Sequence, residues 1–550
     1  MEGWRMKLER NDNETNREGF RVALEMDRNL IRNRIGSFYK KLFREENAGQ
    51  NSCEEMREVL GLINKRVSQG NNAKLEVVPS DQELEECVQK LAKDKAPGLD
   101  GISADVLREM WETAKPLCKL MLEAFWEDEE LTGAEKKGVI KLLAKNDEKC
   151  RLENWRPITL LGITYKLANK IIADRIKPLL PGLISGQQTG FIPGRTIFDN
   201  ILTLKLGEEW AVASGQEAIF LKLDFVKAYD RCEGIKVNNL SQLVHSLFAD
   251  DMGLCLNADE DNFKEAKNII EKFERISGAQ LNVAKSLIIP LGMENIPRWI
   301  LETGCRVVAE GDVWTYLGTP VGVKVGEDQL ETFLLEKLTR RVNHWSNRML
   351  TWEGRCIVLK HAIATMPNYY FMTLGLSTNG YKKLERICWQ FLWGKNGEGG
   401  HKKSLVSWNR ICREKEEGGL GICTFRTQAQ TLKMRLISRI LEGDNAEWTG
   451  VAKELIEMEF NRKKINRGKE RTAQEILLLE NPGRISHSVT MKNMLQGWTA
   501  CRSKLQLTIR ETKLNKGISL ELLTSTGELN LGKHGGGGGG EGLESAEKTM

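Results

Sequence analysis

Apolar residues recur at spacings of three and four in several stretches of the chain, which is typical of helices with one buried face. The stretch REGFRVALEMDRNLIRNRIGSFYKKLF runs from Arg17 to Phe43 and predicts a helical entry segment. A second stretch, SDQELEECVQKLAKDKA, begins at Ser80, a residue type that caps helix N-termini. We expect this second helix to stop at Pro97 and Gly98.

Two stretches near the middle of the chain have the pattern of strands that end in acids. FLKLDFVKAYDR starts at Phe220, and HSLFADDMGLCL starts at His245. The second stretch predicts a β-hairpin with Asp250 and Asp251 at its tip, and Asp224 ends the preceding strand. An Asp-Asp pair alone is weak evidence, since about one is expected by chance in such a chain. Together with the flanking apolar runs, the pattern predicts three carboxylates at one point, where hard divalent cations bind oxygen ligands.

The chain after these acids continues with three recognisable patterns. EDNFKEAKNIIEKFERISG predicts an amphipathic helix whose buried face carries Phe263, Ala266, Ile269, Ile270 and Phe273. YLGTPVG predicts a strand and a turn over residues 316–322. LEKLTRRVNHWSNRMLTWEGRCIVLKHAI, which follows, interleaves basic residues with two tryptophans. These tryptophans are explained either by a core or by a surface that stacks on nucleic acid.

Composition narrows the class of protein. The 550 residues are 41% hydrophobic and 29% charged, which is enough for a sizeable core and several domains. The net charge of +5 is small, but six Lys or Arg stand against two Glu between Glu336 and Lys360. No run of about 18 apolar residues is present and the N-terminus is too charged for a secretory signal. We therefore expect an intracellular protein, in the nucleus or cytoplasm, without a membrane partner.

Cysteine and histidine offer no metal site in the sequence. The 12 cysteines contain no C-x-x-C pair, and neither they nor the six histidines have zinc-finger or zinc-knuckle spacing. A metal ion, if one is bound, is expected to be held by carboxylates.

Basic residues recur on an apolar background between residues 95 and 204. Lys166, Lys170 and Arg175 fall along one edge of a predicted helix, which suits a solvated face as well as a nucleic-acid surface. Arg156 and Arg195 instead lie in turns beside Pro or Gly, where functional residues are common. Phosphate contact and a structural role are equally good explanations for these two arginines.

Seven segments then carry a family resemblance by their order: KAPGLDGI, NWRPITLLGITYKLANKIIADRI, GQQTGFIPGRTIFDNIL, LKLDFVKAYDR, SLFADDM, SGAQLNVAKS and YLGTPVG. They resemble reverse transcriptases of non-long-terminal-repeat retrotransposons, the LINE-like elements. The resemblance runs from about Asp94 to Gly322 and continues more weakly to about residue 440. It implies an RNA-directed DNA polymerase with an RNA template, a DNA primer and deoxynucleoside triphosphates as partners.

The resemblance also implies an α+β fold in the form of a right hand. Its expected parts are a helical entry segment (1–80), fingers (81–215), a palm with an antiparallel sheet (216–325), a helical thumb and post-thumb region (326–440), a helical and polar C-terminal region (441–533) and a disordered Gly-rich tail (534–550).

Specific roles follow from the resemblance position by position. Asp224, Asp250 and Asp251 correspond to the catalytic acids, which would bind two Mg²⁺ ions. The Phe225 carbonyl lies beside the first of them, and Tyr229 corresponds to the aromatic residue under the incoming sugar.

Three further residues of the family pattern are basic. Lys285 corresponds to a lysine near the triphosphate, and Arg156 and Arg195 correspond to contacts with template or nucleotide.

The connection between the two acidic segments departs from the family pattern. Relatives carry a helix, a hairpin and the start of a supporting helix between them, whereas here CEGIKVNNLSQLVH leads directly from Arg231 to SLFADD. This predicts an internal deletion near Cys232 and a palm that lacks support for its catalytic strands. Three hypotheses follow: an active polymerase, an inactive remnant that binds nucleic acid, and a chain that does not fold stably.

Overall fold

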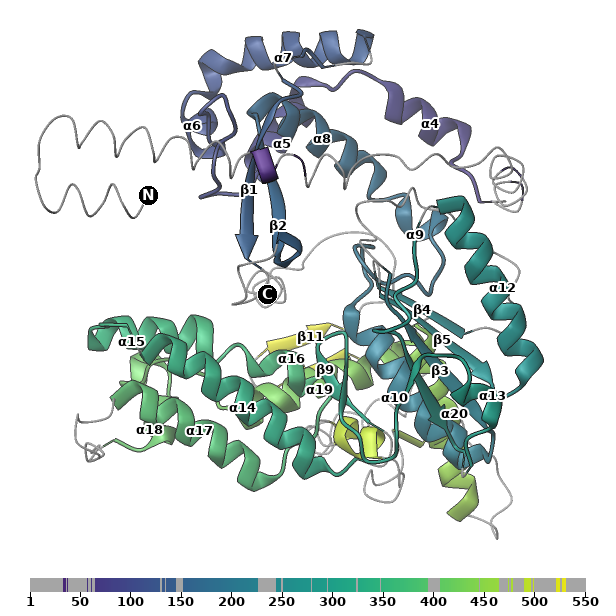
Figure 1. Cartoon of the computed structure of the whole chain (residues 1–550). Helices are drawn as coiled ribbons and strands as arrows, with labels where there is room; N and C mark the ends of the chain where they lie inside the picture. The colour runs from purple at the N-terminus through teal and green to yellow at the C-terminus, as the bar shows by residue number, and fades with distance from the viewer. Residues whose placement is uncertain are drawn as a thin grey trace, which may run out of the picture. The chain divides into compact units, whose positions relative to one another are not determined.

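The computed structural model describes most of the chain between residues 65 and 463 and scattered positions outside this range (Figure 1). The described residues are 65–128, 131–133, 135–144, 152–225, 244–248, 251–277, 279–293, 295–322, 325–346, 348–393, 406–444 and 446–463, with 33–35, 37, 57, 61, 473, 476, 477, 489–495, 498, 521–524 and 527–530. The structure is a mixed α/β fold with antiparallel sheets, and its residues fall into two compact units.

The first unit contains residues 1–195, 224–243 and 260–282. Its elements are α4 Gln69–Glu76, α5 Asp81–Lys90, α6 Ala104–Glu109, α7 Trp111–Asp128, β1 Gly138–Ala144, η1 Leu152–Asn154, β2 Trp155–Leu161, α8 Ile163–Ile176, α9 Leu180–Leu183 and α12 Glu260–Ser277. Its core lies among α5 to α8 and comprises Leu84, Cys87, Val88, Leu107, Cys118, Leu122, Ile163, Leu167, Ala168 and Ile171. The helix expected from Arg17 to Phe43 lies outside the described residues except at 33–35 and 37, which are helical.

Helix α5 confirms the predicted start and corrects the predicted end. The Ser80 hydroxyl accepts a hydrogen bond from the Glu83 amide at 3.2 Å, as expected for an N-cap. The helix ends at Lys90, well before Pro97, and Leu91 is already extended. Arg108 of α6 donates to the carbonyl oxygens of Val88, at 3.2 Å, and Leu91. The guanidinium thus satisfies carbonyl groups at the helix end, which the sequence pattern did not reveal.

Helix α8 begins at a cap supplied from another segment. Gly162 stands at the N-cap and has no side chain to offer, but the Ile163 amide donates to the Asp100 carboxylate at 2.5 Å. The loop carrying Asp100 passes so close that a Cβ on Gly98 would lie 2.4 Å from the Leu161 carbonyl carbon. The segment PGLDG therefore has a structural role in starting α8.

The amphipathic helix predicted after the acids is α12. Ala266 and Ile270 are buried, and Phe263, Ile269 and Phe273 are partly buried, so the predicted face is confirmed. The ring of Phe273 packs against that of Phe225 with centroids 5.7 Å apart.

The second unit contains residues 196–223, 244–259 and 283–550 and is built on a five-stranded sheet. The strand order is β4 Val244–Phe248, β5 Asp251–Asn257, β3 Ala218–Leu223, β6 Leu287–Leu291 and β7 Arg306–Val307. All neighbours are antiparallel except β6 and β7. A separate hairpin joins β8 Trp314–Tyr316 to β9 Thr319–Val321, which confirms the strand and turn predicted in YLGTPVG.

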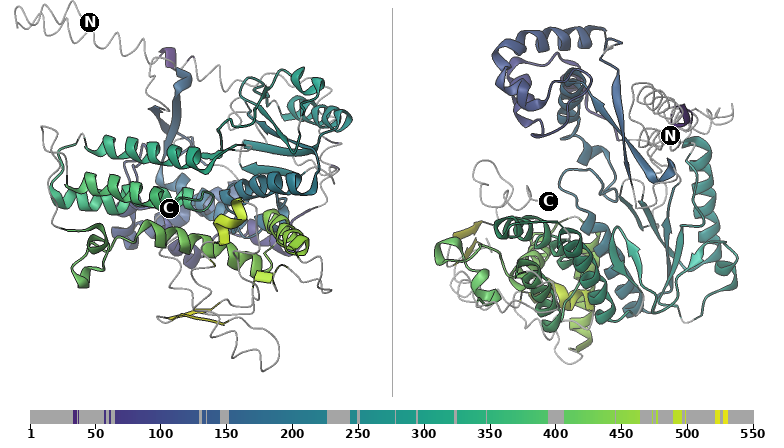
Figure 2. Two further views of the ribbon diagram at one scale, coloured as in Figure 1. Left: turned by 90° about the horizontal axis from the view of Figure 1, so that it is seen from below. Right: turned by 60° about the vertical axis from the view of Figure 1, so that its left-hand side comes forward.

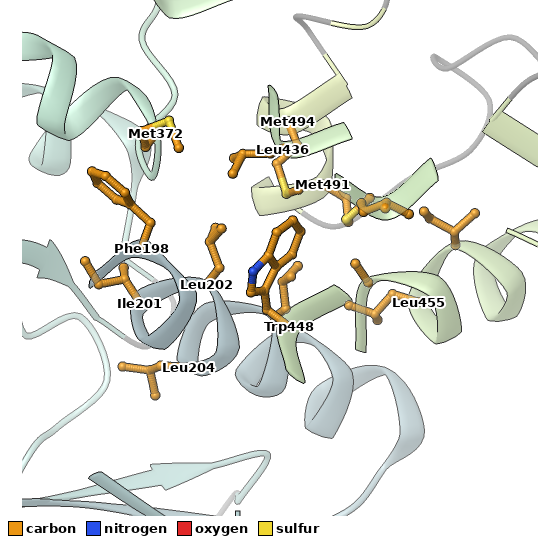
Figure 3. Close-up of a cluster of buried hydrophobic side chains, with 14 of the residues drawn as sticks. Phe198, Ile201, Leu202, Leu204, Met372, Leu436, Trp448, Leu455, Met491 and Met494 are labelled. Atoms are coloured by element: carbon orange, nitrogen blue, oxygen red, sulfur yellow. The ribbon is translucent and has the colours of Figure 1, made fainter. Parts of the chain in front are cut away.

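Helix α10, Ile197–Ser214, links the sheet to the C-terminal helices of the same unit. Its first turn is a capping box between Thr196 and Asp199, and it ends at Gly215 with φ of 72°. The buried Asp199 carboxylate also pairs with Arg439 at 2.6 Å and accepts from the Trp448 indole at 2.9 Å. Apolar side chains of α10 pack around Trp448 (Figure 3).

The remaining described elements of this unit are mostly helices. They are α13 Arg298–Leu301, α14 Glu327–Ser346, α15 Trp352–Val358, η2 Leu359–Ile363, α16 Pro367–Phe371, α17 Thr378–Trp393, α18 Trp408–Ile411, η3 Lys415–Glu417, α19 Phe425–Glu442, α20 Glu447–Lys463, β10 Glu521–Thr524 and β11 Gly527–Asn530. Helices α14 and α17 lie side by side, as Figure 2 shows, and with α16 and α19 they enclose a second core. Trp345 is partly buried there, whereas Trp352 is 47% exposed.

Candidate active site

The acid-bearing strands are neighbours in the five-stranded sheet. Leu223, the last residue of β3, pairs with Met252, the second residue of β5. The C-terminal end of β3 and the N-terminal end of β5 therefore lie at the same edge of the sheet. Asp224 directly follows β3, and Asp251 is the first residue of β5.

The predicted hairpin of the acidic pair is confirmed by the pairing of β4 with β5. Its register pairs Phe248 with Asp251. Asp250 falls between these two strands and lies outside the described residues, as does Tyr229. The meeting of all three carboxylates therefore stays a prediction.

Asp224 and Phe225 contact the segment after α12 within the first unit. The Asn282 amide donates to the Asp224 carbonyl at 2.7 Å, and Phe225 forms an isolated antiparallel bridge with Leu281. Both residues are partly buried. The backbone around the first predicted catalytic acid is thus tied down within its own unit.

The predicted basic contacts have different surroundings. Lys285 is exposed in a turn before β6. The turn predicted at Arg156 is wrong, because Arg156 is exposed on strand β2, where it pairs with Leu143 in the register of the hairpin. The guanidinium of Arg195 donates to backbone carbonyls of the preceding loop, among them Gln188 at 2.8 Å and Ile184 at 3.1 Å. Arg195 thereby holds this loop together, and nucleotide contacts at all three residues stay predictions.

The donor chemistry of the strand ends suits magnesium better than a softer metal. Asp224 and Asp251 each carry a carboxylate, whereas Cys255 on β5 keeps its proton, because burial raises its pKa to about 11. Within the described residues, no group of three or more His, Cys, Asp and Glu side chains is placed to hold a metal ion. Two magnesium ions therefore remain a prediction that depends on Asp250.

The β8–β9 hairpin packs against the acid-bearing sheet. Tyr316 is fully buried, and its ring meets that of Phe220 on β3 edge to face, with centroids 5.5 Å apart. A Cβ on Gly253 of β5 would lie 2.4 Å from the Phe220 ring and 3.1 Å from the Tyr316 hydroxyl. Only glycine at position 253 allows Phe220 and Tyr316 to approach β5 this closely. The alternation of apolar residues that predicted this strand gave no indication of the requirement.

Several structurally important residues were not singled out by sequence reasoning. Asp100 caps α8 from a distant segment, Asp199 holds the distant side chains of Arg439 and Trp448, and Tyr369 contacts the β8–β9 turn. The segment KAPGLDGI was noticed as a motif, but its carboxylate could have been assigned only with α8 in place.

Comparison with known proteins finds one family model that matches part of the chain and relatives that share parts of their length with it. The family model of the reverse transcriptase (RNA-dependent DNA polymerase) matches residues 136–236, a range that includes Asp224. The transposon TX1 uncharacterized 149 kDa protein of Xenopus laevis is 24% identical over 560 aligned positions, which cover 86% of this chain and 41% of that protein. The 115 kDa protein in type-1 retrotransposable element R1DM of Drosophila melanogaster is 28% identical over 161 residues, 28% of this chain and 15% of that protein.

The chain spans less than half of the length of either relative. No helix among the described residues is long and apolar enough to cross a membrane. The chain therefore carries a reverse-transcriptase domain and is homologous to proteins of non-long-terminal-repeat retrotransposons.

Proposed function

We propose that this chain is the RNA-directed DNA polymerase part of a non-long-terminal-repeat retrotransposon protein. It adds deoxynucleotides to a DNA primer along an RNA template, with fingers over residues 81–215, a palm over 216–325 and a thumb over 326–440. The observation that supports this most directly is the pairing of β3 with β5, because the strand end before Asp224 and the strand that starts at Asp251 share one sheet edge. The reverse-transcriptase match over residues 136–236 adds the reaction type.

The proposed chemistry assigns one role to each residue. Asp224, Asp250 and Asp251 hold two Mg²⁺ ions, whose charge supports the attacking hydroxyl and the leaving pyrophosphate when they are bound. Tyr229 lies under the incoming sugar and rejects a 2′-hydroxyl. Lys285 balances the triphosphate charge, with Phe225 beside the site.

The arginines and the hairpin complete the proposed path of the nucleic acid. Arg156 and Arg195 face template or nucleotide. The segment YLGTPVG of the β8–β9 hairpin resembles the family's element that grips the primer end, and the hairpin is assigned that role. The packing of Tyr316 against Phe220 supports the last assignment, because it ties the hairpin to an acid-bearing strand.

Primer extension tests this function. The wild-type chain with a primed RNA, magnesium and deoxynucleotides is expected to extend the primer, and Asp251→Asn is expected to lower the rate by about a hundredfold or more. Asp259→Asn is the matched control, because Asp259 is exposed just beyond the other end of β5. Equal activity of the wild-type chain and Asp251→Asn would contradict the assignment.

A second candidate function is that of an inactive remnant that binds nucleic acid. The relative from Xenopus laevis supports it, since an alignment of 560 positions contains only 86% of these 550 residues and must include residues that this chain lacks. The reverse-transcriptase match also stops at residue 236, close to the deletion predicted near Cys232. Retention on RNA that weakens steeply with salt, without extension, would identify this function.

A further inference from the structure

The turn of the β8–β9 hairpin has an unfavourable residue at its first position. Leu317 and Gly318 connect the strands with φ of 48° and 83°, so both are left-handed. Two-residue turns of this kind fit the twist of a hairpin and favour Asn-Gly, whereas a leucine at positive φ is strained. Something outside the hairpin is needed to hold this turn.

Tyr369 of α16 is in the position to do so. Its hydroxyl donates a hydrogen bond to the Leu317 carbonyl, and it would lie 3.7 Å from a Cβ on Gly318. Its ring packs against Phe198 of α10 with centroids 5.2 Å apart. Burial raises the pKa of the Tyr369 phenol, so the group remains a donor at neutral pH.

The other end of the hairpin is fixed to the sheet. Tyr316 is buried against Phe220 and approaches Gly253, two residues after Asp251 in β5. The hairpin is thus held at its strands by the acid-bearing sheet and at its turn by a helix of the same unit (Figure 1).

We propose that Tyr369 is a positioning residue for the primer end. Tyr369 fixes the β8–β9 turn, and the fixed turn holds the end of the primer at a constant place relative to β5. This inference rests on the proposed function, because it needs a primer that the chain binds and extends.

The test compares three hydroxyl or turn variants of the full chain. Tyr369→Phe removes only the hydroxyl, and Tyr370→Phe is the matched control, since the Tyr370 hydroxyl accepts from Lys337 at 3.0 Å, away from the turn. Tyr369→Phe with Leu317→Asn creates an Asn-Gly turn, which adopts the same shape without help. Primer extension gives kcat and the KM for primed RNA, and 2-aminopurine at the primer 3′ end reports its environment without catalysis.

Tyr369→Phe is expected to lower kcat roughly tenfold while the KM for primed RNA stays the same, because a misplaced end reacts slowly although the duplex still binds. The 2-aminopurine signal of Tyr369→Phe should also differ from that of the wild-type chain. Tyr370→Phe should leave kcat and this signal unchanged. Addition of Leu317→Asn to Tyr369→Phe should restore both kcat and the signal.

Two outcomes separate the inference from the proposed function. A wild-type chain that extends primers equally well with Tyr369→Phe, or shows the same 2-aminopurine signal in both, overturns the positioning role alone. A wild-type chain that binds primed RNA without extending it overturns the polymerase function, while the 2-aminopurine comparison still decides the role of Tyr369. A wild-type chain that binds no primed RNA overturns both.

Discussion

Arg175 of α8 illustrates what a single side chain does in this protein. Its guanidinium pairs with both oxygens of Glu83 at 2.7 Å, donates to two backbone carbonyls near α4 and lies 5.4 Å from the centre of the Trp126 ring. The sequence placed Arg175 on the basic edge of a helix, and that pattern suited a solvated face as well as a nucleic-acid surface. In the structure Arg175 joins α8 to Glu83, which lies 92 positions earlier in the chain. No local sequence pattern reveals a partner at that distance.

Other residues could be placed from the sequence because their chemistry is local. Ser80 was predicted as a cap from its own neighbours, and Asp251 was predicted at a hairpin tip from the apolar runs on both sides. Asp100 could not be assigned, since its partner, the Ile163 amide, is 63 positions away.

Glu208 of α10 gives a pH-dependent prediction. Burial is the main cause that raises its pKa from 4.5 to about 7, and the neighbouring Glu209 adds to the shift. The folded chain therefore binds more protons than the unfolded chain between pH 4.5 and 7, so the contribution of Glu208 to stability is complete below this window and lost as the pH rises through it. In the wild-type chain this titration should lower the free energy of unfolding by about 2 kcal/mol across the window, and we expect Glu208→Gln to abolish that decrease.

Chemical unfolding at several pH values measures this effect. The exposed Glu217→Gln is the control and should keep the pH dependence of the wild-type chain. The burial assignment fails if Glu208→Gln and the wild-type chain give parallel curves.

At the scale of elements, the periodicity of apolar residues predicted the helices and strands whose formation depends on their own sequence. Helix α12 and the β4–β5 hairpin were predicted from the repeat or alternation of their apolar positions. Residues 316–322 were predicted as a strand and a turn, and the pairing of that strand with β8 was not. The end of α5 was predicted wrongly, because Arg108 of another helix takes its last carbonyl groups. Starts set by local caps are readable in the sequence, whereas ends set by distant donors are not.

The start of α8 gives a sharp test, because its cap depends on the close approach of the backbone at Gly98. Gly98→Ala would place a Cβ within 2.4 Å of the Leu161 backbone and displace the loop that brings Asp100 to the helix end. We expect a loss of about 1 to 3 kcal/mol and faster amide hydrogen exchange in α8.

Gly70→Ala is the matched control for this substitution. Gly70 lies in α4, and a Cβ there meets nothing within 4 Å, so alanine should be neutral or stabilising by up to about 1 kcal/mol. Similar exchange rates in α8 for both variants would contradict the close-approach explanation.

At the scale of the whole molecule, the sequence order hides how the core of the second unit is assembled. Its main core combines α10, the sheet, α19 and α20 with residues as late as Trp498. We predicted a helical and polar C-terminal region over residues 441–533, without a part in the core. The partners of this region on α10 lie more than two hundred positions earlier, which no pattern within the C-terminal region indicates.

Truncation tests this arrangement. Removal of residues 441–550 takes Trp448, Leu455 and Ile456 from the core, and each is at most 1% exposed. We expect this variant to lose cooperative thermal unfolding and to be recovered mainly as aggregate, because several large side chains leave at once. Removal of residues 534–550 alone should leave the melting temperature unchanged. Equal melting curves for the two truncations would show that the C-terminal helices do not complete the core.

The contact between Asp199 and Trp448 also sets an order of events during protein synthesis. The two residues are 249 positions apart, so a ribosome that adds about 5 to 20 residues per second needs roughly 12 to 50 seconds to make the second after the first. The arginine partner, Arg439, lies 240 positions after Asp199, so the carboxylate lacks both partners for most of this time. A chain that terminates before Trp448 therefore leaves the Asp199 carboxylate without its indole partner and the apolar face of α10 without the late helices that cover it.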